Sequence, residues 1–550
     1  MNHLSGMDAS FLHLESPEMP MHVGSLQILD LPEGYAGDFY EDVKRYMGSR
    51  IHLASVFQRK LALMPFDLAN PVWVDDEDVD LDYHVRHVIL PRPGTFEQLE
   101  KYVARLHSSL LDRSRPLWET YVIEGLANGQ VAVYNKAHHA GIDGQAGVAI
   151  AKALLSDSAN PPPVKPPRPR LLTNRYQLGV AELMGAALAN SLTQTVKLVR
   201  SLPEVLEAVV SVLYPKPEGK GAKRRLSLPS FQFGPRTQLN VAITNQRSYA
   251  ARTLALAEVK AMAKRSGTSV NDIVMAICAG ALRRYLNDYD VRPDKPLIAG
   301  VPVSLREAGN TDANNQVSMM LVSLATDIKD PLERLAAINA SANEGKKLQG
   351  SVKGVIPMDF PSLGVPWLMS GLASLYGRSR LANRIPPIAN VAISNVPGPQ
   401  FPLYFAGAKL AHFFPVSIPG HGVALNITVQ SYNGLLEVGL TACRRALPDV
   451  ADLGNYIVEE HQKLFALIAA REAVGAAATA AALPSAVPEQ KAAAKKAPSR
   501  PRAAPRRAPK KPADRVVPAA ASPLIAPVPA SATARKPARK RAPASAARAA

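Results

Sequence analysis

The 550-residue chain contains only two cysteines, Cys278 and Cys443, and no apolar run long enough to cross a bilayer. Two cysteines so far apart, both in apolar surroundings, argue against a disulfide framework and a cysteine-based zinc site. The N-terminus lacks the basic region and apolar stretch of a signal peptide. These absences predict a protein of the reducing cytoplasm that uses no metal and no tightly bound cofactor.

Positive charge is concentrated at the C-terminal end of the chain. Of the formal net charge of +18, residues 491–550 supply +15, from 16 Lys and Arg against the single acidic residue Asp514. Residues 473–550 consist mainly of Ala, Pro, Lys and Arg without one aromatic residue, so we expect a disordered basic tail there. Such a polycation binds anionic lipid or nucleic acid, or serves no partner at all.

Strands and helices alternate in two long segments, which predicts the α/β class. The first segment, residues 1–157, includes an expected hairpin over Asn128-Gly129. Residues 158–239 contain proline-rich and basic linkers around a helical stretch at 177–214. The second segment, residues 240–472, includes a hairpin over Asn433-Gly434, a dipeptide that favours the type I′ turn.

One short motif, His138-His139-Ala140-Gly141-Ile142-Asp143-Gly144, carries the chemistry. It lies between an expected buried strand at 131–137 and an expected helix at 145–155, which gives Asp143 the N-cap position. A histidine at a strand end is held rigidly and still reaches a substrate, as a general base requires. A loop with incidental histidines is the alternative, but two histidines with Asp-Gly at this gap are rare by chance.

Seven sequence blocks, in this order, resemble the bacterial wax ester synthase/acyl-CoA:diacylglycerol acyltransferases. They are LSGMDASFLHLE from Leu4, RPLWE around Trp118, HHAGIDG, SVNDIVMAICAGALRRYL from Ser269, VPVSLR from Val301, SNVPGP from Ser394 and NITVQSYNG from Asn426. The resemblance covers roughly residues 1–470. It implies two chloramphenicol-acetyltransferase-like α/β sandwich halves around a central channel, with the active site in mid-channel.

The resemblance also implies roles for the motif residues. His139 is the expected general base, and His138 is expected to be packed and hydrogen-bonded rather than to touch substrate. Asp143 is expected to be structural and to pair with an arginine, for which Arg59 is the candidate. Gly144 permits close packing or an unusual backbone angle after the cap.

Three further residues are candidates for the site. Asn271, in the first turn of an expected helix, is the candidate donor to the developing oxyanion, although ordinary helix-start polarity explains it equally well. Trp118 is expected in the core or in the channel wall. Asn395 is either a substrate contact or a turn residue. Without a glycine-rich phosphate loop, scattered Lys or Arg must hold the phosphates of coenzyme A.

The resemblance implies transfer of a long-chain acyl group from acyl-CoA to diacylglycerol or a long-chain alcohol, on a membrane or lipid-inclusion surface. An acyl thioester is already activated, so neither a metal nor a covalent nucleophile is needed. Two alternatives remain open. One is condensation on a carrier-bound thioester, and the other is a non-catalytic lipid-inclusion scaffold with an anion-binding tail.

Overall fold

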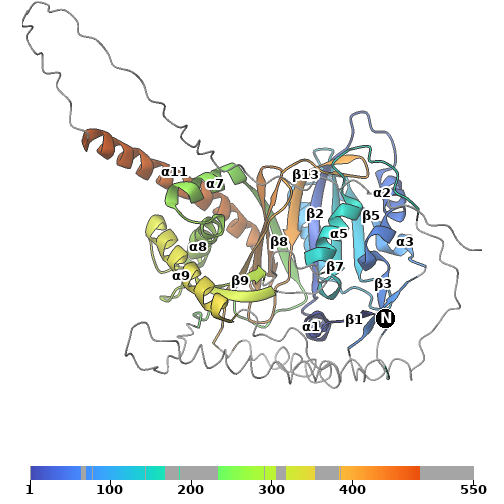
Figure 1. Ribbon diagram of the computed structural model, residues 1–550, viewed down its shortest axis with the longest axis horizontal. Coiled ribbons are helices and arrows are strands. Elements are labelled where there is room, and N and C mark those ends of the chain that lie inside the picture. The colour runs from blue at the N-terminus through green and yellow to red at the C-terminus, as the bar shows by residue number, and fades with distance from the viewer. Residues whose placement is uncertain are drawn as a thin grey trace, which may run out of the picture. The chain divides into compact units, whose positions relative to one another are not determined.

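The computed structural model describes residues 2–62, 70–76, 78–142, 144–166, 185, 233–289, 291–304, 317–352, 383 and 386–482. Of the disordered tail expected at 473–550, residues 473–482 instead continue a helix that ends at Ala482, because their alanine-rich sequence favours helix, and the rest lies outside these residues. Nearly all of the expected helical stretch at 177–214 also lies outside them. Two six-stranded sheets with helices packed on them make up most of the described chain (Figure 1). The predicted α/β class is thereby confirmed, whereas the channel between the halves stays a prediction.

The first sheet has the strand order β12-β13-β2-β7-β6-β5. Its four N-terminal strands are β2 (His22–Asp30), β5 (Val85–Ile89), β6 (Trp118–Glu124) and β7 (Val131–His138). Strands β6 and β7 form the antiparallel pair expected over Asn128-Gly129, where Gly129 has the positive φ of 78° that glycine tolerates. Strand β2 is antiparallel to β7 and brings His22 opposite His138.

Helices cover both faces of this sheet. They are α2 (Phe39–Gly48), α4 (Phe96–His107) and α5 (Gly144–Leu154). Helices α2 and α5 share one hydrophobic cluster with the outer face of the sheet. Helix α4 packs on the opposite face, together with residues of the second sheet, and we call this the inner face. Because side chains alternate along β7, His138 shares the inner face with Tyr134 and Lys136.

The second sheet has the strand order β10-β9-β11-β14-β15-β8. Its strands are β8 (Arg247–Ala255), β9 (Ile298–Ser304), β10 (Val317–Ser323), β11 (Val391–Val396), β14 (Leu425–Tyr432) and β15 (Leu435–Cys443). Strands β14 and β15 meet at the expected hairpin, in which Asn433 and Gly434 both have positive φ, as a type I′ turn requires.

Four helices pack on the second sheet, on the side away from the first sheet (Figure 1). They are α7 (Leu256–Ser266), α8 (Val270–Asp288), α9 (Pro331–Val352) and α11 (Val450–Ala482). The spacing of Ser269 and Asp272 predicts a capping box, and α8 begins with it: each side chain accepts from the other's backbone N–H. None of the described helices combines the length and the apolar character needed to cross a membrane.

Two strands of the first sheet come from far along the chain. Strands β12 (Tyr404–Phe405) and β13 (Ala408–Val416) extend the sheet beyond β2. Where β13 meets β15, a Cβ at Gly439 would lie only 1.8 Å from the carbonyl oxygen of Pro415, so glycine is required there. The two halves are therefore interlocked, and the segment boundaries expected near residues 157 and 240 stay a prediction.

Short elements differ from the sequence expectation near the N-terminus. The alternating sequence YHVRHVIL at 83–90 predicts one strand, but the short helix α3 (Leu81–His84), capped by the Asp80 carboxylate, precedes β5. The start of the chain forms helix α1 (Gly6–Leu14), which the hydroxyl of Ser5 caps at the backbone N–H of Asp8. A small sheet of β1 (Asn2–His3), β4 (Val72–Asp75) and β3 (Arg59–Ala62) lies beside it.

Candidate active site

The histidine pair stands where strand β7 ends. The 3-10 turn η4 (His139–Gly141) follows at once, and α5 begins at Gly144, so the predicted strand–motif–helix order is confirmed. The backbone N–H of His138 donates to the carbonyl of Leu117 at 2.9 Å, and that of His139 donates to the carbonyl of Met21 at 2.8 Å. Neighbouring chain segments thus fix the main chain of both histidines.

Both ring nitrogens of His138 face protein atoms, one through a hydrogen bond and the other across a short distance to a carboxylate, and the side chain is fully buried. Its Nδ1 accepts the backbone N–H of Ala140 at 3.1 Å, so the ring proton resides on Nε2. This Nε2 lies 3.2 Å from Oε2 of Glu15. With one nitrogen accepting and the other facing a carboxylate, His138 stabilises the turn and has no nitrogen left for substrate.

The Glu15 carboxylate joins four parts of the chain. Besides His138, it accepts the backbone N–H of Met21 at 3.0 Å and the Nη2 of Arg113 at 2.9 Å. Its side chain is 3% exposed. Burial raises the pKa of Glu15, but the contacts with His138, Met21 and Arg113 outweigh burial and hold the pKa well below its usual range. Glu15 is therefore ionised and fully partnered.

The imidazole of His139 is half-buried and lies flat against another ring. It stacks on Phe11 with the centroids 4.0 Å apart and an angle of 17° between the ring planes. Burial lowers the pKa of His139 to about 4, and a hydrogen bond to its own backbone offsets only part of that effect. The ring is therefore neutral at physiological pH, the form that accepts a proton.

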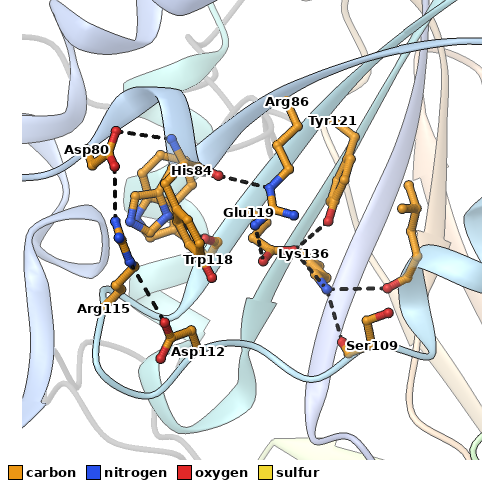
Figure 2. A network of polar contacts seen from close by, with 12 residues as sticks. Asp80, His84, Arg86, Ser109, Asp112, Arg115, Trp118, Glu119, Tyr121 and Lys136 are labelled. Carbon is orange, nitrogen blue, oxygen red and sulfur yellow. Dashed lines mark hydrogen bonds and ion pairs between the residues drawn. The ribbon is translucent and has the colours of Figure 1, made fainter.

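A second buried charge supports the strand that leads to the histidines (Figure 2). Lys136, two residues before His138 on the inner face, has a fully buried ammonium 2.9 Å from Oε2 of Glu119. The ammonium also donates to the carbonyls of Leu106 and Ser109 at the C-terminal end of α4. Burial lowers the pKa of Lys136, and Glu119 opposes that effect. The network ties β6, β7 and α4 together directly beneath the motif.

Trp118 lies in the core. Its side chain is 2% exposed in the outer-face cluster, on the face of the sheet opposite to His138. Its indole N–H donates to the carbonyl of Phe57 at 3.2 Å, and its ring stacks on His84 with the centroids 4.3 Å apart (Figure 2). Of the two alternatives open from the sequence, this geometry matches the core and not the channel wall.

Asn271 and Asn395 lie in the second half of the molecule. Asn271 is half-buried in the first turn of α8. Its neighbour Asp272 is buried and bonded to Ser269 and Asn339, so Asp272 has a structural role. Asn395 lies in β11, where it is aligned with Val429 of β14. Their contacts with substrate stay predictions.

Of the predicted pair of Asp143 and Arg59, the structure describes only Arg59. Asp143 lies outside the described residues, although α5 begins immediately after it, as an N-cap there requires. Arg59 opens strand β3, with its Nε 3.6 Å from the carboxylate of Asp75. The pairing of Arg59 with Asp143 therefore stays a prediction.

Sequence reasoning missed Glu15, Arg113, Phe11, Lys136 and Glu119. Glu15 and Glu119 fall inside the blocks LSGMDASFLHLE and RPLWE, but nothing local marks their partners. Arg113, for example, is 98 residues from Glu15 along the chain. Lys136 did carry a local signal, because a lysine within the apolar run VAVYNKA needs a buried counter-charge.

Comparison with known proteins agrees with this geometry. Residues 4–274 match the family model of the wax ester synthase/diacylglycerol acyltransferase catalytic domain, and residues 313–464 match that of the WS/DGAT C-terminal domain. A putative diacylglycerol O-acyltransferase of Mycobacterium tuberculosis is 38% identical over 451 residues, which cover 81% of this chain and 96% of the relative. The O-acyltransferase WSD of Acinetobacter baylyi is 34% identical over 484 residues, 87% of this chain and all of the relative.

A solved structure of this family is similar to the present structure. The wax ester synthase/diacylglycerol acyltransferase of Marinobacter aquaeolei superposes with a TM-score of 0.60 at 33% sequence identity. The superposition covers 85% of this chain and all of that chain. The family likeness therefore extends from sequence to fold.

The Glu15 network predicts a pH-dependent loss of stability. We expect Glu15→Gln to lower the free energy of unfolding by about 3 kcal/mol at pH 7, because it removes the buried carboxylate that His138, Met21 and Arg113 all contact. The folded pKa of Glu15 is below the ordinary value of 4.5, so its contribution is present above pH 4.5 and is lost as the pH falls toward the folded pKa. Denaturant unfolding of parent and variant at pH 7 and at low pH measures this difference.

Glu97→Gln is the matched control, because Glu97 makes an exposed ion pair with Lys101 one turn along α4. We expect it to cost less than about 0.5 kcal/mol. Equal losses from Glu15→Gln and Glu97→Gln at pH 7 would contradict the structural role given to Glu15.

Proposed function

Since this chain belongs to the wax ester synthase/diacylglycerol acyltransferase family, we propose that it takes its acyl group from acyl-CoA and uses His139 as general base. Membership makes it an O-acyltransferase that acts on diacylglycerol or a long-chain alcohol, with triacylglycerol or wax ester as product. The observation that carries the proposal is the contrast between the two histidines. His138 is fully buried, with Nδ1 accepting from Ala140 and Nε2 facing the Glu15 carboxylate, whereas His139 is half-buried and neutral at the strand end.

The proposed reaction needs one base and one oxyanion donor. Neutral His139 takes the proton of the acceptor hydroxyl while the oxygen attacks the thioester carbonyl, so a C–O bond forms and the carbonyl oxygen becomes an oxyanion. Asn271 is the proposed donor to that oxyanion. When the intermediate collapses, the C–S bond breaks and the His139 imidazolium returns its proton to the thiolate. Free coenzyme A and the ester leave.

The proposal predicts a reaction that depends on both the acceptor and His139. With palmitoyl-CoA, thiol release should rise on adding hexadecanol or a diacylglycerol, and the matching wax ester or triacylglycerol should form. His139→Ala should lower kcat by about 100-fold to 10,000-fold, the usual contribution of a general base. Thiol release and chromatography of the neutral lipids measure both.

His87→Ala is the control, because His87 lies on edge strand β5, where its Nε2 is 2.8 Å from the carboxylate of Glu124. It should keep the parent rate. Stimulation by neither acceptor would favour a carrier-bound donor or a scaffold without activity. Full activity of His139→Ala would refute the proposed base.

The lowered pKa of His139 predicts the acid side of the rate profile. Because the neutral ring is the active form, kcat/KM should be independent of pH above about 5 and should fall tenfold per pH unit below about 4. Circular dichroism at each pH separates unfolding from titration. A midpoint near 6.5, the ordinary value for histidine, would contradict the buried environment described for this ring.

We also propose that the enzyme works at a lipid surface, since its acceptors are lipids. Residues 484–550 form a unit distinct from residues 1–483, so the tail can be removed as a whole. The tail carries nearly all the net positive charge, which favours anionic membranes. We expect the full chain to co-sediment with vesicles of anionic phospholipid, and the chain lacking residues 484–550 to bind them at least tenfold more weakly. Unchanged vesicle binding, or preference of the tail for DNA over vesicles, would contradict this role.

A further inference from the structure

Phe11 is half-buried at a junction of two hydrophobic clusters. It packs against the small cluster that α1 forms with the turn η4, and also against the large cluster of the second half. Leu4, just before α1, and Ala9 and Leu12 within it are almost fully buried, so the helix that carries Phe11 is firmly placed. The backbone that carries the phenyl ring is therefore held in place from both sides.

Helix α1 and its C-cap residue together touch both histidines, through side chains four positions apart. Phe11 stacks on His139, and Glu15, four positions later, faces Nε2 of His138. Arg113 fixes this turn of the chain, because its guanidinium donates both to the carbonyl of Leu12 and to the carboxylate of Glu15. Phe11 and Glu15, four positions apart, thus contact His139 and His138, two consecutive residues at the end of β7.

Phe11 restricts the orientation of the His139 ring, which the backbone hydrogen bonds of His139 do not fix. Hydrogen bonds fix the main chain of His139, but the torsion that turns an imidazole ring about its own axis is broad and weakly restricted. A parallel ring at 4.0 Å occupies one whole face of the imidazole and excludes other orientations of its plane. The nitrogens lie in the imidazole plane, at the edge of the ring, so stacking aims them without covering them.

We infer that Phe11 is a positioning residue, whose ring sets the plane of the His139 imidazole and so aims the nitrogen that takes the acceptor proton. The inference deepens the proposed function and rests on the role of His139 given there. It concerns the planarity of the Phe11 side chain and not only its apolar volume. The inference can therefore be tested by comparing a substitution that removes the planar ring with one that keeps it.

Phe11→Leu keeps an apolar side chain and removes the plane, whereas Phe11→Tyr keeps the plane. We expect Phe11→Leu to lower kcat by about tenfold to 100-fold, the scale of a misplacement of about 1 Å, with KM within about twofold of the parent. Phe11→Tyr should keep kcat within about threefold. Phe96→Leu is the control for the chemical change, because Phe96 is 38% exposed on α4. It should keep the parent kcat.

A spectroscopic readout makes the test independent of turnover. In protein labelled with 13C-histidine, we expect the ring current of Phe11 to shift the Cε1 proton of His139 upfield, because the two rings are stacked. His139→Ala assigns this signal. We expect the signal to move downfield in Phe11→Leu and to stay in place in Phe11→Tyr and Phe96→Leu.

The outcomes separate this inference from the proposed function. Parent-like kcat in Phe11→Leu, equal losses in Phe11→Leu and Phe11→Tyr, or a loss carried by KM alone would overturn the positioning role. An unmoved Cε1 proton in Phe11→Leu would overturn the stacking itself. Activity that survives His139→Ala would instead refute the proposed base, and the proton shifts would still decide whether Phe11 orients the ring.

Discussion

The buried carboxylate of Glu15 is the interaction on which the site depends. A carboxylate with 3% exposure is tolerated only where charge and hydrogen bonds compensate for lost water. Here Arg113, Met21 and His138 supply that compensation from three other parts of the chain. Because each partner is needed by the carboxylate, the N-terminal helix, the segment after it, and the end of β7 are held in one arrangement.

The same principle joins the two halves of the molecule. Glu100 of α4 is 4% exposed, and its carboxylate accepts the backbone N–H of Ala251 at 2.7 Å on edge strand β8. Arg252 of that strand lies 2.9 Å from the same carboxylate and supplies the opposite charge. The C-terminal end of α4 receives the buried ammonium of Lys136. One helix therefore connects the strand beneath the histidines to the edge of the second sheet.

Short sequence patterns were sufficient to predict several turns and helix starts of the fold. The hairpins over Asn128-Gly129 and Asn433-Gly434 and the capping box at Ser269 were predictable because turn and cap chemistry acts over a few residues. The same logic, applied to Ser5 and Asp80, would have found helices α1 and α3. The partners of Glu15 and the placement of β13 in the first sheet were not predictable, since contacts between distant segments leave no local pattern.

The low pKa of His139 affects the two proton transfers of the proposed reaction in opposite ways. A ring whose conjugate acid has a pKa of about 4 is a weak base, so removing the hydroxyl proton is favourable only as the new C–O bond forms. The imidazolium that results is a strong acid relative to a thiol, whose ordinary pKa is about 8.5. Return of the proton to coenzyme A is therefore downhill. Burial of the base thus makes removal of the hydroxyl proton the more demanding transfer and its return to the thiolate the easier one. Because His139 takes and returns the same proton, its pKa leaves the equilibrium of the overall reaction unchanged.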